Sequence, residues 1–387
     1  MSQLRIPAVY MRGGTSKGVF FLAHDLPADP RRRDEILMRV IGSPDRYARH
    51  IDGLGGATSS TSKVVILSRS SRPDCDVDYL FGAVAIREAV IDWSGNCGNL
   101  SAAVGPFAIS SGLVGAPPDG MATVRIWQAN TGRKIIAHVP MRAGDVEESG
   151  DFDLDGVAFA SARIVLEFLD PAGDARSDGT SAMFPTGNRI DTLTVPAIGA
   201  VEATLINAGN PTIFIHAASL GLVGTELQHD INNNSSVLAK AEAVRAAGSV
   251  AMRLATTHDE ATTKRPHTPK LALVAPASGY RASDGRQVAA ESIDVLARMF
   301  SMGQLHHAMP GTGAVALAVA AAIPDTLVHR IAPTGAEGQL RFGHPSGTLT
   351  VAAEAHKQAG NWIVGKVILS RSARRLMEGW VRVPTGE

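Results

Sequence analysis

Cys97 is one of two cysteines in the chain, and it lies in the stretch SGNCGNLSAAVG between paired asparagines and glycines. The apolar residues at 100, 103, 104, 107 and 108 recur at helical spacing, which predicts an amphipathic helix that begins just after the thiol. Unpaired N–H groups and the positive dipole end at a helix start favour a thiolate or a bound anion. The alternative is an inert buried cysteine. We favour a role for Cys97 in an active site.

A lysine stands at the entry of an apolar strand in the stretch GATSSTSKVVIL, directly after a run of hydroxyl side chains. A lysine at a strand end is ordinarily solvated. Where such a lysine faces a cleft, desolvation favours the neutral amine, which is able to act as a base. A bound polycarboxylate would instead stabilise the charged form. Lys63 is therefore a candidate base. The residues alone do not decide whether its amine is neutral or charged when a substrate is bound.

The glycine-rich stretch RGGTSKG covers residues 12–18. It is not a phosphate-binding P-loop, because the GxxxxGK[ST] spacing is absent and no helix is predicted to follow. We expect a turn in which backbone N–H groups, Ser16 and Lys17 face a carboxylate. The alternative is a plain surface hairpin.

A second glycine-rich stretch, PGTGAVALAVAAAIP, opens an apolar helix that we expect to be buried on all sides over residues 314–323. Its GTGAVA segment matches the dinucleotide pattern G-x-G-x-x-A. However, no buried strand precedes it, and no acidic residue follows at the required distance. We expect anion-binding donors at Gly311, Thr312 and Gly313, and no nucleotide cofactor.

A metal site is not expected. His306 and His307 are adjacent and would point apart, the two cysteines are far apart in the sequence, and no H-x-x-x-H or C-x-x-C spacing occurs. The sequence therefore predicts neither a metal nor another cofactor.

The chain has 387 residues, with 37 basic and 37 acidic side chains that leave no formal charge. This balance argues against nucleic acid or an anionic membrane as a partner. The longest apolar run is far shorter than the ~20 residues that span a bilayer. The first residues lack the apolar stretch of a signal peptide, and the two cysteines suit a reducing compartment. We expect a cytoplasmic protein that acts on a small molecule.

Strand-like segments dominate the chain, and turn-forming residues separate them. Besides the two helices described above, helical periodicity predicts helices over residues 235–255 and 289–302. In each half, strands lead to a glycine-rich turn that opens an apolar helix. This weak internal symmetry predicts an α+β fold of two similar domains with a cleft between them, and a linker at residues 182–191.

Several stretches together match one known family: MRGGTSKGVFF, IDGLGGATSSTSKVVILS, WSGNCGNLSAAVGPFAI, FPTGN, HTPKLALVAP, SMGQLHHAM, FGHPSGTL and SRSARRLMEGWV. On these the chain resembles, nearly end to end, the 2-methylaconitate isomerase (PrpF) family, whose relatives include 4-oxalomesaconate tautomerase and methylitaconate isomerase. The form GGATSSTSK and the context DWSGNCGN are closer to the 2-methylaconitate branch.

The resemblance implies the diaminopimelate epimerase-like fold, in which each of two similar domains wraps a sheet around a central helix and the active site lies in the cleft between them. On this basis we place the N-terminal domain at residues 1–187, completed by the C-terminal segment 366–387. The C-terminal domain then covers residues 188–365.

The resemblance also assigns the catalytic pair. Epimerases of this fold carry a cysteine at each central helix, whereas this chain has Cys97 at the first and Pro310 at the second. A two-cysteine racemase is therefore not expected. In the isomerase branch a lysine acts with the thiol, and these residues match Lys63 and Cys97. The stretch NAGNPT is similar to the substrate-binding GNP turn of the epimerases, and its matching residue is Asn210.

The implied activity is a cofactor-independent isomerisation of an unsaturated tricarboxylate, from 2-methyl-trans-aconitate to 2-methyl-cis-aconitate. Lys63 would remove an allylic proton, and either Lys63 or Cys97 would return it. The alternatives are a 4-oxalomesaconate tautomerase or a methylitaconate or aconitate delta-isomerase. The expected substrate contacts are Arg12, Ser16, Lys17, Asn96, Gly98, Asn99, Asn210, Lys270, Gly311, Thr312, Gly313, His344 and Ser346.

Two further expectations concern partners. Family resemblance implies a homodimer. The rival to an enzyme is a non-catalytic accessory protein of an iron–sulfur methylcitrate dehydratase, and a functional link to such a dehydratase is compatible with both readings. An accessory protein needs its partner to show any effect, whereas an isomerase turns over small molecules alone.

Overall fold

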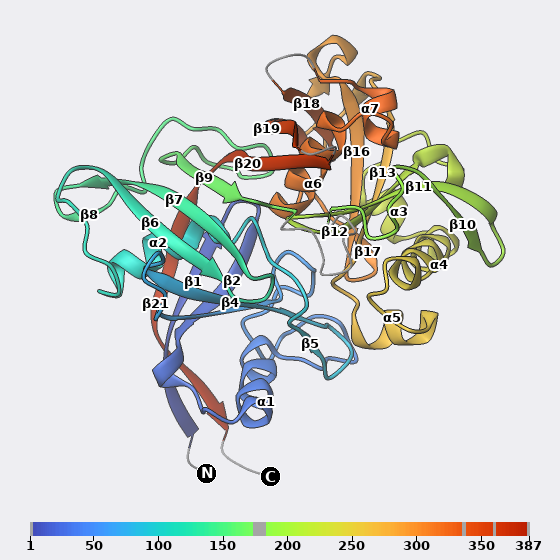
Figure 1. The fold of residues 1–387 in the computed structure, drawn as a ribbon. Helices are drawn as coiled ribbons and strands as arrows, with labels where there is room; N and C mark the ends of the chain where they lie inside the picture. Colours follow the sequence, from blue (N-terminus) through green and yellow to red (C-terminus); the bar gives the residue numbers. More distant parts are fainter. Residues whose placement is uncertain (1–2, 173–182, 335–337, 359–360, 385–387) are drawn as a thin grey trace. The chain divides into compact units, whose positions relative to one another are not determined.

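The computed structural model of the chain describes residues 3–172, 183–334, 338–358 and 361–384 (Figure 1). The chain divides into two compact units. Unit 1 comprises residues 1–166 and 370–387, and unit 2 comprises residues 167–369. The divisions fall inside β9 (Ile164–Leu169) and β20 (Asn361–Arg371). The sequence placed domain boundaries after residues 187 and 365, and the start of its predicted linker, at residue 182, lies outside the described residues.

Unit 1 is built on a sheet in which β21 and β2 flank β1 as antiparallel neighbours (Figure 1). Strand β2 lies parallel to β3, β3 antiparallel to β4, and β4 parallel to β6. β6 and β7 continue the series as an antiparallel pair, and β7 also pairs with β8. The strands are β1 (Gln3–Gly13), β2 (Ser16–Leu22), β3 (Lys63–Arg69), β4 (Val77–Val84), β5 (Ile91–Asp92), β6 (Gly120–Gln128), β7 (Arg133–Arg142), β8 (Asp145–Val146) and β21 (Ala373–Pro384).

Helix α2 (Ser101–Ser110) forms the centre of unit 1 and packs against β1, β6, β7, β8 and β21. Every residue from Ser101 to Ala108 is buried. The predicted helix is thus confirmed, but its predicted amphipathic character is wrong, because strands cover it on several sides. A Cβ added at Gly105 would lie 2.7 Å from Val139, so the helix backbone approaches β7 closely.

A separate apolar cluster lies between the sheet of unit 1 and helix α1 (Pro30–Ile41). Asp29 caps this helix, since its carboxylate accepts the N–H groups of Arg31 and Arg32. Strands such as β2 and β3 are therefore buried on both faces, which explains their continuous apolar sequences.

Unit 2 repeats the strand arrangement. Antiparallel β10–β11 and β11–β12 pairs lead to parallel β12–β13, antiparallel β13–β16, parallel β16–β18 and antiparallel β18–β19 pairs. The strands are β10 (Asp191–Val195), β11 (Gly199–Ala208), β12 (Asn210–His216), β13 (Lys270–Pro276), β14 (Tyr280–Arg281), β15 (Gln287–Val288), β16 (Val295–Ser301), β17 (Gln304–Leu305), β18 (Gln339–His344) and β19 (Gly347–Gln358).

The central helix of unit 2 is α6 (Gly311–Ala322), which is buried from Gly311 to Ala321 and packs against β11, β12, β18 and β19. The prediction of a helix buried on all sides is confirmed. Helix α4 (Ser235–Ala251) packs against β10 and β13 and ends four residues before the predicted limit. The remaining helices are α3 (Gln228–Asn232), α5 (His258–Lys264) and α7 (Leu327–Ile331), with 3-10 turns η1 (Ala23–Asp25), η2 (Ala217–Leu220) and η3 (Ala290–Ser292).

The two units share one topology, so the predicted α+β fold of two similar halves is confirmed. The helix predicted over 289–302 is wrong, because this segment forms η3 and then strand β16. Every residue of β16 is buried, so its apolar residues show no alternation that would mark a strand. Within the described ranges, none of the helices combines the length and the apolar character needed to cross a lipid bilayer.

Candidate active site

Lys63 and Cys97 meet inside unit 1. Lys63 is the first residue of β3, and its Nζ donates hydrogen bonds to Ser16 Oγ at 3.0 Å and to Cys97 Sγ at 3.2 Å. The side chains of Lys63 and Cys97 are both buried, and the Lys63 amine lies 5.7 Å from the centre of the Phe81 ring. Among the described residues, Lys63 forms no ion pair with a carboxylate. The two groups predicted to do chemistry are therefore in direct contact.

The thiol lies at the start of α2, as predicted. Its Sγ accepts the N–H of Leu100 at 3.4 Å, and its carbonyl oxygen accepts the N–H of Ser101 at 2.9 Å. Within the described parts of the chain, the N–H groups of Gly98 and Asn99 form no hydrogen bond. These two donors, together with the dipole of α2, make the surroundings of the thiol favourable for negative charge.

Tyr79 supports the Cys97 backbone from β4. Its hydroxyl donates to the Cys97 carbonyl oxygen at 3.3 Å. Complete burial, and next the charge on Cys97, raise the pKa of Tyr79 well above its usual value. Tyr79 is therefore a neutral donor that fixes the backbone at the thiol.

Ser16 is the first residue of β2, directly after the turn that joins β1 to β2 inside the RGGTSKG stretch. Asn99 Nδ2 donates to Thr15 Oγ1 at 2.9 Å and lies 3.5 Å from Ser16 Oγ. Gly14 adopts a φ of +50°, and a Cβ there would lie 2.6 Å from Asn99 Oδ1. Only glycine tolerates this conformation and this close approach without cost. Gly14 therefore allows the turn to bring Thr15 and Ser16 against Asn99.

The structure does not bring Arg12 and Lys17 to this cluster. The Arg12 guanidinium donates to Gly14 O, to the carbonyl and hydroxyl oxygens of Ser372, and to Ser161 Oγ, at 3.0–3.1 Å. It thereby ties the turn to the C-terminal segment. Lys17 lies over the Tyr10 ring at 5.4 Å, and successive side chains of a strand point to opposite faces, so Lys17 points away from Ser16.

Unit 2 holds a second buried lysine. Lys270 is the first residue of β13, and its Nζ donates to Ser301 Oγ at 2.6 Å and lies 3.0 Å from His267 Nδ1. Near the start of α6, Asn210 Nδ2 donates to Thr312 Oγ1 at 3.2 Å. The structure thus pairs Asn210 with Thr312, two of the predicted substrate contacts.

Lys63 and Lys270 occupy corresponding positions in the two units. Thr212, the third residue of β12, pairs with Lys270. In unit 1 the pairing of Val19 with Val64 sets Gly18, the third residue of β2, beside Lys63. The carbonyl oxygens of Cys97 and Pro310 each accept the N–H four residues later, so Pro310 stands where unit 1 has the thiol.

The remaining predicted contacts lie in turns and at helix starts. Asn96 Oδ1 accepts from Ser101 Oγ at 3.4 Å. His344 Nδ1 accepts the N–H of Ser346, whose hydroxyl donates to His307 O at 2.5 Å, so both residues hold the turn between β18 and β19. A Cβ at Gly313 would lie 2.6 Å from Met299 Cε, which explains a glycine in this buried first turn of α6.

A comparison with protein families matches residues 3–384 of the chain to the family described as PrpF protein. The chain belongs to the PrpF family. It is 60% identical to a 2-methyl-aconitate isomerase of Cupriavidus necator, over 99% of this chain and 98% of the relative. It is 59% identical to a 2-methyl-aconitate isomerase of Shewanella oneidensis and 41% identical to a 3-methylitaconate isomerase of Eubacterium barkeri, each over at least 98% of both chains.

Solved structures agree with this membership of the PrpF family. A methylitaconate-delta-isomerase matches with a TM-score of 0.74 and 40% identity, and the match covers 99% of this chain and 96% of that one. A probable proline racemase from Agrobacterium radiobacter matches with a TM-score of 0.56 at 13% identity, which supports the fold alone. The predicted diaminopimelate epimerase-like fold is confirmed, and this PrpF-family chain is an isomerase.

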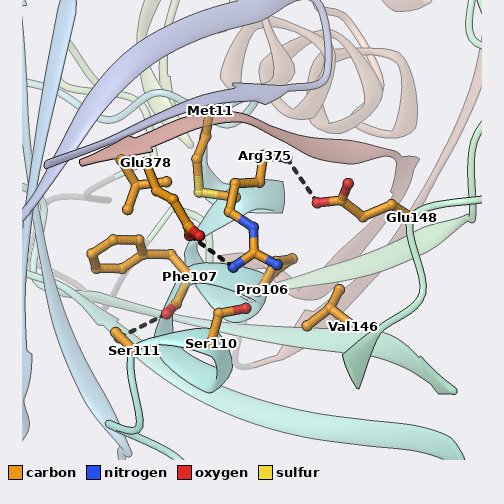
Figure 2. A pocket seen from close by; sticks show the side chains of 10 residues that line it. Met11, Pro106, Phe107, Ser110, Ser111, Val146, Glu148, Arg375 and Glu378 are labelled. Carbon is orange, nitrogen blue, oxygen red and sulfur yellow. Dashed lines mark hydrogen bonds and ion pairs between the residues drawn. The ribbon is translucent and has the colours of Figure 1, made fainter. Parts of the chain in front are cut away.

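A cavity of about 60 Å³ in unit 1 of this PrpF-family chain lies apart from the candidate site (Figure 2). None of the predicted site residues lines it, and residues at the C-terminal end of α2 do, whereas Cys97 precedes the N-terminal end. The ten residues of α2 span ~15 Å. In Figure 2 the Arg375 guanidinium is paired with Glu378, and the backbone N–H of Arg375 donates to the Glu148 carboxylate. The charged side chains that line this cavity therefore already have partners in its wall.

The sequence missed four residues around these lysines and amides: Thr15, His267, Ser301 and Arg371. Arg371 Nε donates to Asn99 Oδ1 at 3.0 Å. His267 stands three residues before Lys270 in HTPK, which is part of a stretch that carries the family resemblance, so its position beside Lys270 in the sequence was a signal for it. Ser301 ends strand β16 and lies inside the segment 289–302 that was predicted to be helical. Among the described residues, no group of three or more His, Cys, Asp or Glu side chains is arranged to hold a metal ion.

Proposed function

We propose that this chain converts 2-methyl-trans-aconitate to 2-methyl-cis-aconitate by allylic proton transfer, with Lys63 as the base. Two relatives that share 60% and 59% identity over nearly their full lengths carry the name 2-methyl-aconitate isomerase, which supports this substrate. The observation that carries the mechanism is the buried Lys63 amine, held by Ser16 and Cys97 and by no carboxylate among the described residues.

The two hydrogen bonds of Lys63 orient its lone pair. A neutral amine has two N–H bonds and one lone pair in tetrahedral directions. When the N–H bonds point to Ser16 Oγ and Cys97 Sγ, the lone pair takes the remaining direction. A substrate C–H bond placed along that direction meets a base that needs no rotation before it reacts.

The proposed step balances without a cofactor. The lone pair of Lys63 Nζ takes a proton from the substrate CH2 group that lies between the alkene and a carboxylate. The electron pair of the broken C–H bond spreads over the alkene and its carboxylate, so the former double bond gains single-bond character and rotates. Return of one proton to the same carbon, from Lys63 or Cys97, completes the isomerisation. A positioned acid–base group typically contributes about 10²–10⁴-fold to the rate.

The developing negative charge needs fixed donors. The N–H groups of Gly98 and Asn99 and the Ser16 hydroxyl provide them, and the dipole of α2 has the correct sign. We assign these groups to the carboxylate next to the reacting carbon.

Lys270, Asn210 and Thr312 are proposed ligands for the substrate carboxylates, since all three are buried donors near the starts of β13, β12 and α6. The expectation that one substrate binds in a cleft between two domains, and the domain boundaries themselves, stay predictions from the family resemblance. Four further expectations also stay predictions: the cofactor-independent reaction, the homodimer, the cytoplasmic location and a functional link to an iron–sulfur dehydratase.

Proton NMR tests the proposal. Purified protein alone is incubated in D2O with 2-methyl-trans-aconitate, and in parallel with trans-aconitate, beside the variants Lys63→Ala and Cys97→Ser. We expect conversion to the cis isomer with deuterium entering the allylic position, and we expect Lys63→Ala to lose both signals while it keeps the wild-type circular dichroism spectrum.

The outcomes separate the alternatives. Conversion of trans-aconitate with no conversion of 2-methyl-trans-aconitate would keep the mechanism and change the substrate. The absence of conversion and exchange on all of these acids would overturn the proposal and favour the accessory role, which a reconstitution with an iron–sulfur dehydratase would then examine.

A further inference from the structure

Arg371 is a buried cation directly behind the candidate site of unit 1. Its side chain is 2% exposed. Its Nε donates to Asn99 Oδ1 at 3.0 Å, and its Nη1 donates to the carbonyl oxygen of Ser370 at 3.0 Å. Its Cδ would lie 3.0 Å from a Cβ at Gly14, so the guanidinium stem packs against the turn that carries Ser16.

No carboxylate balances this charge among the described residues. Burial lowers the pKa of Arg371 to about 10, and the opposing influence is the charge on Cys97. An arginine at this pKa remains protonated at neutral pH. A buried cation without a carboxylate partner is costly for folding, which points to a use for Arg371 beyond packing.

The hydrogen bonds from Arg371 have a fixed direction. A guanidinium only donates, so the atom of Asn99 that faces it must be the carbonyl oxygen Oδ1. The amide NH2 of Asn99 then has to face Thr15 Oγ1 and Ser16 Oγ, which act as acceptors. Lys63 Nζ also donates to Ser16 Oγ.

We propose that Arg371 is a positioning residue that acts through Asn99 to keep the Ser16 hydroxyl available as a donor to a substrate carboxylate. Because N–H groups of Lys63 and Asn99 occupy the acceptor positions of Ser16 Oγ, its own proton points away from both of them. This inference rests on the proposed function of the Lys63 site and adds a residue to it.

Loss of Arg371 would free the Asn99 amide to rotate. Oδ1 would then be able to face Ser16 and accept its proton, while the bond from Lys63 would remain. The base would stay in place, but the Ser16 hydroxyl would donate its proton to Asn99 Oδ1. It would then no longer be available as a donor to the substrate carboxylate. The defect should therefore appear as a raised KM with a smaller change in kcat.

The test combines kinetics of purified variants with 2-methyl-trans-aconitate. Arg371→Met should raise KM by roughly 10- to 100-fold, by analogy with the loss that is typical when the group that orients a metal ligand is removed. Asn99→Asp keeps an acceptor for Arg371 but replaces the NH2 with oxygen, so it should raise KM to a similar extent. Arg371→Lys keeps the charge and a donor and should recover part of the loss. Arg374→Met, at an exposed neighbouring position, is the matched control.

A double-mutant cycle separates positioning from general structural damage. If Arg371 acts through Ser16, adding Arg371→Met to Ser16→Ala should change KM by less than twofold. The inference would be overturned if the rise in KM of the double variant equalled the product of the rises in the two single variants. It would also be overturned if Arg371→Met had a KM within twofold of wild type. Should Arg371→Met not fold, as judged by circular dichroism, Asn99→Asp decides: a normal KM overturns the inference and a raised KM supports it.

The same series distinguishes this inference from the proposed function. Lys63→Ala is measured beside the other variants. If it retains activity, the base assignment fails. If Lys63→Ala is inactive while the Arg371 and Asn99 variants behave as wild type, only the role of Arg371 fails.

Discussion

The Nζ of Lys63 donates a hydrogen bond to the Sγ of Cys97 at 3.2 Å inside unit 1. The two residues are 34 positions apart in the sequence. Strand β3 delivers the lysine, and the turn that precedes α2 delivers the thiol. Because both side chains are buried, this contact is held by the fold and does not depend on a flexible surface lysine.

Removal of the Lys63 amine should abolish turnover. Lys63→Met keeps most of the stem that packs near Phe81 but has no base, so we expect kcat/KM to fall by at least about 10³-fold, within the range for a general base. Deuterium incorporation from D2O should disappear in parallel. Lys134→Met, on a half-exposed lysine of β7, is the control and should behave as wild type. Residual exchange in Lys63→Met at a tenth of the normal rate would refute the assignment.

Cys97→Ser should leave a working enzyme. A hydroxyl is able to accept the hydrogen bonds from Lys63 Nζ and the Leu100 N–H that now reach Sγ, although at a shorter reach from the backbone. We expect a reduced kcat with continued deuterium exchange, because the base is retained. A loss as complete as that of Lys63→Met would instead show that the thiol returns the proton.

Much of the fold was predictable from periodicity and turn residues. The buried character of α6 could be predicted because an unbroken apolar run has no polar face to place in water. Strand β16 could not be predicted, because burial on both faces removes the alternation that identifies a strand. The amphipathic character assigned to α2 failed because small residues such as Ser101 and Ala102 are compatible with either environment.

The candidate site was predictable where chemistry is local. Cys97 at a helix start and Ser16 in a glycine turn follow from neighbouring residues. Arg371 could not be found in this way, because it reaches Asn99 across 272 positions of sequence. Arg12 shows that a local pattern can also mislead. A cation beside glycines suggests an anion site, yet the N–H groups of Arg12 donate to Gly14, Ser161 and Ser372.

Lys270 should contribute to binding more than to chemistry. Its amine lies beside Ser301 and His267, with no thiol at the corresponding helix start, where Pro310 stands. We expect Lys270→Met to raise KM for 2-methyl-trans-aconitate at least tenfold, since a charge-assisted contact with a carboxylate contributes about 1.5–3 kcal/mol. Lys240→Met, on the exposed side of α4, serves as the control. An unchanged KM for Lys270→Met would exclude Lys270 as a substrate ligand.

A methyl group at Gly14 should damage the site more than the fold. Gly14→Ala forces a side chain into a φ of +50°, which costs about 1–2 kcal/mol, and places Cβ against Asn99 Oδ1. Gly112→Ala carries a similar backbone cost at a φ of +71°, with no atom within 4 Å of the added Cβ. We expect both variants to lower Tm, and only Gly14→Ala to lose activity. Equal activity in the two variants would contradict the contact between this turn and Asn99.

The stability of the protein should depend on pH through His50, which lies in the loop between α1 and β3, the strand that begins at Lys63. His50 is buried with a φ of +54°, and its Nδ1 accepts from the Ala57 N–H and lies 3.3 Å from Ser62 Oγ. Burial is the main cause that lowers the pKa of His50, while the Ile86 backbone and Asp45 act in the opposite direction. In an unfolded chain a histidine titrates near ~6.5.

The sign follows from this difference. Because the folded pKa is lower than the unfolded one, the unfolded state binds the proton more readily as the pH falls. Neutral His50 makes its full contribution to the free energy of unfolding at a pH above the unfolded pKa. This contribution is lost as the pH falls from there through the folded pKa. His50→Asn keeps an acceptor near Nδ1 and tolerates a positive φ, yet it does not titrate. The free energy of unfolding, measured by denaturant titration at pH 7.5 and pH 5.0, should therefore fall less in His50→Asn than in the wild type. The exposed His24→Asn variant should retain the wild-type difference, and an equal fall in all three proteins would assign the pH dependence to other groups.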